Sequence, residues 1–126
     1  MLFRSPTYVS PGQQRLGHIE QIIAAAATAD YDRRWRFDVQ VPAAIIKTQP
    51  TDRSAGRSSA EKRITAAAIR EVLAIPDPAR TAGRRILLFD DVCTTGSQLD
   101  AVADCLLREG RAARVRALVL ARAPWR

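Results

Sequence analysis

An apolar run that ends in two adjacent acids constrains the fold of this chain more than any other feature. The segment Arg85–Phe89 reads RILLF, and a short run of this kind is typical of a strand covered on both faces, as in a parallel sheet. Asp90 and Asp91 follow it, and a small-residue segment from Thr94 to Gln98 leads into a helix. Because ligands of open α/β sheets bind beyond the carboxyl ends of the strands, we expect a binding site here.

The rest of the chain alternates between strand and helix patterns. Apolar spacing predicts helices over Gly17–Ala29, after a cap at Ser58 or Ser59, and after Gly96 up to Gly110. The predicted apolar faces of the second and third helices are Ile64, Ala68, Ile69, Val72 and Leu73, and Leu99, Val102, Ala103, Leu106 and Leu107. Strands are predicted to end within Phe3–Val9 and to cover Ala43–Lys47 and Arg114–Ala121. This order predicts one α/β domain over residues 1–126, an open and mainly parallel sheet with flanking helices.

Composition narrows the class of protein. The chain has 126 residues, 47% of them hydrophobic, and its apolar runs are too short to cross a bilayer. We therefore expect no membrane partner, and without a recognisable secretion signal we expect a cytoplasmic location. Cys93 and Cys105 lack the spacing of a zinc site and are expected to be free thiols. The net charge of +7 favours polyanionic partners such as nucleic acid, although scattered arginines can equally reflect genomic base composition.

The segment after the apolar strand combines two kinds of chemistry. Two carboxylates at a strand end are costly unless cations, hydroxyl donors or a Mg²⁺-bound ligand compensate them. Small residues around Gly96 let backbone N–H groups converge on an anion at a helix N-terminus. A phosphorylated sugar presents both hydroxyls and phosphate, so it is the ligand that this pattern favours. A plain helix start, with Ser97 and Asp100 as a capping box, is compatible with the same residues.

Other phosphate-binding motifs fit less well. A Walker B strand also ends in acids, but the chain has no GxxxxGK[ST] loop to accompany it. A GxGxxG motif is absent too, and Val92 stands where an Asp-x-Asp site would need its second acid.

The segment Ile86–Gln98, ILLFDDVCTTGSQ, resembles the phosphoribosyl pyrophosphate (PRPP) motif of type I phosphoribosyltransferases. The wider stretch Ile45–Arg122 resembles the ComF-type (competence protein F-like) branch of that family, through IIKT, RSSAEKR and the segment from Arg84 onwards. The resemblance implies a Mg²⁺-dependent transfer of a phosphoribosyl group to a nitrogenous acceptor, with release of pyrophosphate. PRPP or a nucleotide monophosphate would be the ligand.

The resemblance also implies a role for each matching residue. Asp90 and Asp91 would contact the ribose hydroxyls, directly or through Mg²⁺, and would act in catalysis together with Lys47. Arg15, in the loop Ser10–Arg15, and Lys47 would bind pyrophosphate, and Thr48–Ser59 would be a loop that closes over the substrate. The residues that would hold the 5′-phosphate are Thr94, Thr95, Gly96, Ser97 and Gln98.

Three positions depart from the family pattern. Gln98 replaces a small hydroxyl residue, Cys93 replaces an aliphatic residue, and Thr94 stands where purine-salvage members carry an aspartate. Threonine is no general base at neutral pH, which disfavours hypoxanthine or guanine as the acceptor. The net charge of +7, and a chain with little left over for the part that selects the nitrogenous substrate in this family, favour an alternative function. This alternative is a non-catalytic PRPP or nucleotide-binding regulator, or a nucleic-acid-associated protein related to DNA uptake. The final strand could form an exposed edge at which a homodimer assembles.

Overall fold

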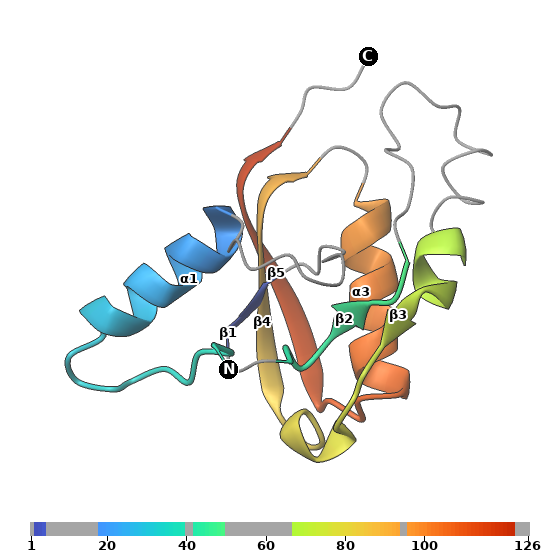
Figure 1. Cartoon of the computed structure of the whole chain (residues 1–126), viewed down its shortest axis with the longest axis horizontal. Helices are drawn as coiled ribbons and strands as arrows, with labels where there is room; N and C mark the ends of the chain where they lie inside the picture. Colours follow the sequence, from blue (N-terminus) through green and yellow to red (C-terminus); the bar gives the residue numbers. More distant parts are fainter. Residues whose placement is uncertain (1, 5–17, 40–41, 50–66, 94–95, 123–126) are drawn as a thin grey trace.

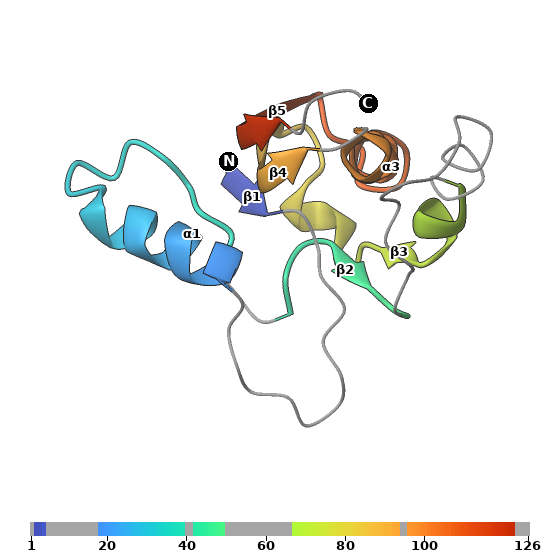
Figure 2. The same ribbon diagram turned by 90° about the horizontal axis from the view of Figure 1, so that it is seen from above.

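The computed structural model describes residues 2–4, 18–39, 42–49, 67–93 and 96–122. Three strands form the main sheet, namely β1 (Leu2–Arg4), β4 (Arg85–Cys93) and β5 (Arg114–Arg122). Two helices, α1 (His18–Ala29) and α3 (Ser97–Arg108), flank this sheet from opposite sides (Figures 1 and 2). The molecule is thus a small α/β structure, and within the described residues no helix is long and apolar enough to span a bilayer.

The main sheet is parallel, with the strand order β1-β4-β5. Leu2 pairs with Leu87 on one side of β4, and Arg85 pairs with Arg114 on the other. Strand β4 lies between the two other strands, and its centre is mostly buried. The apolar pattern therefore correctly predicted a buried strand of a parallel sheet. The predicted strands at 3–9 and 114–121 and the helix at 17–29 are also found, with boundaries shifted by a few residues.

The predicted strand Ala43–Lys47 was wrong in extent, and it does not belong to the parallel sheet. Only Ile46–Lys47 is a strand (β2), and it pairs antiparallel with β3 (Leu73–Ala74) in a separate two-stranded sheet. Leu73 therefore belongs to a strand and not to the preceding helix, of which residues 67–71 are described. The antiparallel pair is continued at Thr48, whose backbone N–H and side-chain Oγ1 both donate to the Val72 carbonyl, at 2.8 and 3.0 Å.

The core lies between the sheet and α3. Ile86 and Leu88 of β4 pack against Val102, Cys105 and Leu106 of α3, and all of these residues are buried. The predicted apolar stripe of α3 was wrong at Leu107, which is exposed, and it omitted the buried Cys105. Ala68 of the earlier helix is likewise exposed, whereas Ile69 is buried as predicted. The helix ends at Arg108, just before Gly110.

The short connection after β3 packs against the chain that follows α3. The 3₁₀ helix η1 (Pro78–Arg80) is capped by Asp77, whose carboxylate accepts from the Ala79 N–H at 3.1 Å. Thr81 follows it, fully buried, and its hydroxyl donates to the Gly110 carbonyl at 2.7 Å. The approach is so close that a Cβ on Gly110 would lie 2.8 Å from Thr81 Oγ1 and 2.7 Å from the Leu106 carbonyl oxygen.

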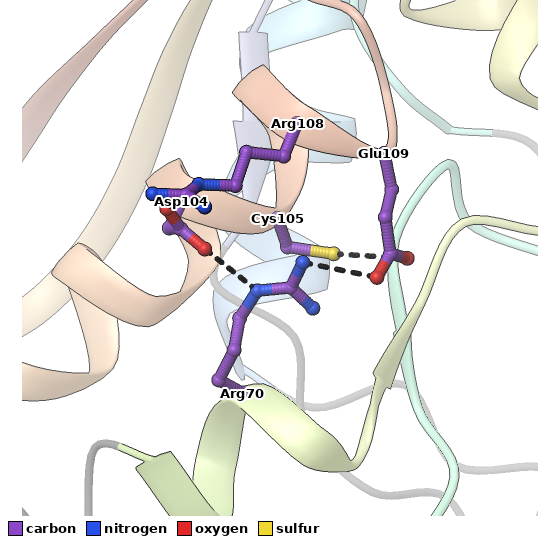
Figure 3. Close-up of polar contacts among 5 residues, drawn as sticks. All are labelled: Arg70, Asp104, Cys105, Arg108 and Glu109. Carbon is purple, nitrogen blue, oxygen red and sulfur yellow. Dashed lines mark hydrogen bonds and ion pairs between the residues drawn. The ribbon is translucent and has the colours of Figure 1, made fainter.

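A polar cluster joins the helical residues 67–71 to α3 (Figure 3). Arg70 donates to Asp104 and to Glu109, at 2.9 Å in each case, and Asp104 also pairs with Arg108. Asp104 has a lowered pKa, chiefly because of the hydrogen bond from Arg70. Burial raises the pKa of the neighbouring Cys105 thiol to about 11, so this cysteine is neutral and unreactive at ordinary pH.

Candidate functional site

The acid pair lies inside β4 and not beyond its end. The strand was expected to end at Phe89, but it continues through Asp90 and Asp91 to Cys93. Because successive side chains of a strand point to opposite faces, Asp90 shares the face of the buried Leu88, which packs on α3, and Asp91 shares the face of Phe89. Asp90 Oδ1 also accepts a hydrogen bond of 2.9 Å from the Asp91 N–H. The two carboxylates are therefore in different environments.

Lys47 lies within electrostatic reach of Asp90, although 42 residues separate them in the sequence. Partial burial lowers the pKa of the Lys47 ammonium, and attraction to the Asp90 carboxylate opposes this shift in part. A partly buried ammonium that interacts with a carboxylate can also bind an incoming anion, such as a phosphate, in place of that carboxylate. Two of the three predicted catalytic residues thus interact electrostatically.

A buried ion pair positions the chain that leads into β2. The Asp38 side chain, which is 1% exposed, pairs with Arg80 through Oδ1 and accepts from the Ala44 N–H through Oδ2 at 2.9 Å. Arg80 also donates to the Pro42 carbonyl at 2.8 Å. These bonds hold the segment before Ile46 against η1. The sequence contains one signal for this ion pair, namely that Asp38 stands at the start of an apolar stretch. A carboxylate buried there would need a charged partner.

The start of α3 differs from the predicted capping box. Gly96 is the N-cap, with φ at 78°, and no side chain forms a cap hydrogen bond there. Ser97 is the first helical residue, and the Asp100 N–H bonds to the Gly96 carbonyl at 2.8 Å. A left-handed backbone favours glycine, and the first N–H groups of a helix have no partner within the helix itself. This helix start therefore keeps the geometry that suits an anion, with Ser97 and Gln98 in its first turn.

Some predicted site residues lie outside the described residues. These are Arg15 and Ser10–Arg15, Thr94 and Thr95, and the loop Thr48–Ser59 beyond Gln49. Arg122 was not singled out from the sequence, yet it is the last residue of β5 and pairs in register with Cys93. It therefore adds a basic side chain to the carboxyl edge of the sheet. Aligning the ends of the two predicted parallel strands would have found it.

The acidic side chains of the site are donors of the kind that suits Mg²⁺. Carboxylate oxygens are hard ligands that suit Mg²⁺, which keeps several waters or ligand oxygens in its shell. Among the described residues, however, no three His, Cys, Asp or Glu side chains gather where they could hold a metal ion. The Asp90 carboxylate alone would suit a Mg²⁺ ion that keeps waters or ligand oxygens in its shell.

Comparison with known proteins identifies a family. Residues 19–126 match the family model described as a phosphoribosyl transferase domain. This match includes β2, β4, α3 and β5, and so every described residue of the site. Comparisons with curated proteins and with solved structures give no match.

Proposed function

Since the chain belongs to the phosphoribosyl transferase domain family, we propose that it binds PRPP with Mg²⁺ and transfers the phosphoribosyl group to a nitrogenous acceptor. Pyrophosphate is the second product. Within the family we place the chain in the ComF-type branch, on the resemblance of Ile45–Arg122.

The observation that carries this proposal is the approach of Lys47 to Asp90. An isolated acid pair on a strand would fit many sites, but a half-buried lysine from a different sheet supports a ligand that has both hydroxyls and phosphates. The uncapped glycine start of α3 follows β4 directly and supplies a second anion position. Sugar hydroxyls would bind at Asp90, pyrophosphate at Lys47, and the 5′-phosphate at Gly96, Ser97 and Gln98.

The chemistry asks little of the protein beyond position and charge. The acceptor nitrogen forms a bond to C1 of the ribose and gives up its proton to water. The bond from C1 to the pyrophosphate oxygen breaks, and its electron pair leaves with pyrophosphate. Lys47 stabilises the charge that develops on the leaving group, and Asp90 orients the ribose and stabilises positive charge on the ring. Mg²⁺, when bound with the substrate, neutralises pyrophosphate charge. The partial burial of Lys47 strengthens its interaction with the leaving group.

Calorimetry with PRPP and Mg²⁺ tests binding. Lys47→Gln and Asp90→Asn should each weaken PRPP binding by about tenfold or more, because each removes a charged partner of the ligand. Arg108→Gln is the matched control, since Arg108 lies at the far end of α3 and is exposed. If the double variant Asp90→Asn with Asp91→Asn bound PRPP as tightly as the wild type, the assignment of the site would be wrong.

Pyrophosphate release across a panel of nitrogenous bases tests turnover. The net charge of +7 supports a second candidate, a PRPP-binding regulator or nucleic-acid-associated protein without turnover. Such a protein would bind PRPP but release no pyrophosphate with any base. DNA binding that depends on salt and survives both aspartate substitutions would indicate a basic surface separate from this site.

A further inference from the structure

We propose that the chain has a second ligand site, a pocket for a nucleoside polyphosphate at the opposite end of the sheet. A pocket of about 530 Å³ lies where β4 and β5 begin. Five of its eight lining residues are arginines, and none of those described residues is acidic. Arg85, which begins β4, is five residues from Asp90 and hence about 17 Å from it along the strand. The pocket is therefore distinct from the site at Lys47 and Asp90.

The parallel register gathers three of these arginines on one face. Arg85 pairs with Arg114, and Leu87 pairs with Arg116, so Arg85, Arg114 and Arg116 point to the same side of the sheet. This is the side away from α3, because the alternate residues Ile86 and Leu88 pack against that helix. Positive side chains that line one pocket favour a bound anion of high charge there.

The connector after α1 supplies the rest of the pocket, with Arg34, Trp35 and Arg36. This segment is fixed by hydrogen bonds: the Arg33 N–H donates to the Asp30 carbonyl at 3.0 Å and the Trp35 N–H donates to Asp30 Oδ2 at 2.9 Å. Arg33 has a left-handed backbone, with φ at 49°, which turns the chain. Arg34 pairs at 3.2 Å with Asp32, but both side chains are largely exposed, so this pair is weak. Trp35 is thus presented on an ordered turn with 55% of its surface exposed.

The combination indicates which ligand fits. Arginine binds phosphate oxygens in a planar, bidentate geometry, and an exposed indole offers a stacking face for a base. The volume lies within the range of about 300–1,000 Å³ that is usual for small-molecule sites, which favours a free nucleotide over a nucleic-acid strand. A ligand with several phosphates would neutralise more than one arginine at once. The structure therefore assigns phosphates to the arginines of the strands and the base to Trp35.

Binding of ATP, of adenosine and of inorganic tripolyphosphate at physiological salt tests the proposal. Trp35 fluorescence reports binding in a Trp125→Phe background, where it is the single remaining tryptophan. We expect ATP to quench Trp35 and to bind more tightly than either adenosine or tripolyphosphate. Arg36→Gln combined with Arg116→Gln should weaken ATP binding by about a hundredfold, because two charged hydrogen-bonding partners are lost. Trp35→Ala removes this reporter, so its binding is measured by calorimetry. The substitution should weaken ATP binding by about fivefold or more and leave tripolyphosphate binding unchanged.

The controls separate this pocket from the other site. Arg108→Gln and Lys47→Gln should leave ATP affinity unchanged, whether or not PRPP binds at Lys47. The proposal is overturned if Lys47→Gln abolishes ATP binding, if adenosine binds as tightly as ATP, or if the double arginine variant retains wild-type affinity. An oligothymidine of twelve nucleotides that binds more tightly than ATP through the same arginines would replace it with a nucleic-acid surface. If the double variant does not fold, the Trp125→Phe protein still tests the proposal. Quenching of Trp35 by ATP supports it, and unchanged Trp35 fluorescence at saturating ATP overturns it.

Discussion

The two faces of the main sheet differ in how completely they are covered. On the α3 face, Leu88, Val102 and Leu106 are fully buried, and the Arg70 cluster closes the rim (Figure 3). On the opposite face, Phe89 in the middle strand is buried, but over β5 the side chains of Leu118 and Leu120 are 49% and 68% exposed. The polar groups are divided as well, with Asp90 on the α3 face and Asp91 and the pocket arginines on the other.

The main apolar core therefore lies on the α3 face, and the arginine-lined pocket lies on the other face. Packing on the α3 face stabilises β4. This stabilisation offsets the cost of partly burying the acidic residues of β4, which are Asp90 and Asp91 near its end. The face over β5 contributes less to the core and leaves arginines free of tight packing. Substitutions on the two faces should therefore have different consequences.

The largest difference is expected for a matched pair of leucines. Leu106→Ala should lower the free energy of unfolding by about 3 kcal/mol, since the side chain is fully buried and the substitution leaves a cavity. Leu118→Ala, on the exposed face, should cost less than about 1 kcal/mol. Urea denaturation measures both values. Equal costs for the two variants would show that β5 is covered on both faces in solution.

A pair of glycines tests how tightly the α3 side is closed. Gly110→Ala should cost about 2 kcal/mol, because the new Cβ would lie 2.7 Å from the Leu106 carbonyl and the backbone there cannot move freely. Gly83→Ala has open space around it and only the strain of its left-handed backbone, with φ at 69°, so it should cost about 1 kcal/mol. Thermal unfolding of the two variants ranks them. A Gly110→Ala protein as stable as Gly83→Ala would contradict the close approach of Thr81 to Gly110.

The Arg70 cluster should contribute less than the apolar core. Arg70→Gln is expected to cost about 1 kcal/mol at neutral pH, since it removes two partly exposed ion pairs. The contribution that involves Asp104 is present above the ordinary aspartate pKa and is lost as pH falls through the lowered pKa of this carboxyl. Unfolding of wild type and Arg70→Gln should therefore converge in acid. Arg108→Gln, the exposed control, should cost only about 0.3 kcal/mol.

The smallest effect is a shift in one titration. Lys47 should titrate below the ordinary lysine pKa, and Asp90→Asn should lower its pKa further by removing the attraction that opposes desolvation. Because the unfolded chain holds this proton more tightly, the contribution of Lys47 to stability should rise with pH between the lowered and the ordinary value.

NMR titration of the Lys47 side chain measures this shift directly. Asp91→Asn is the matched control, and its effect should be smaller because Asp91 points to the other face of the sheet. An unchanged or raised Lys47 pKa in Asp90→Asn would show that the two side chains are not close in solution.

The local patterns of the sequence predicted the central strand, both flanking helices and the final strand. They did so because apolar periodicity and glycine positions act over a few residues. The same patterns were misleading for Ala43–Lys47, where a β-rich run became two residues of an antiparallel pair, and for Leu73, where helical spacing continued into a strand. In both places a partner distant in the sequence decided the backbone, and no local signal identifies that partner.

The sequence alone determined that acids follow an apolar strand and that a glycine-led helix comes next, and these features also indicated the family. Only the tertiary structure decided that Asp90 acts electrostatically on the partly buried Lys47, and that Asp90 and Asp91 face different sides. It also decided that arginines 34, 36, 85, 114 and 116 share one pocket. The physical reason is that charge interactions depend on distance and burial, which arise from strand register and long-range packing, whereas the sequence specifies only the order of the residues.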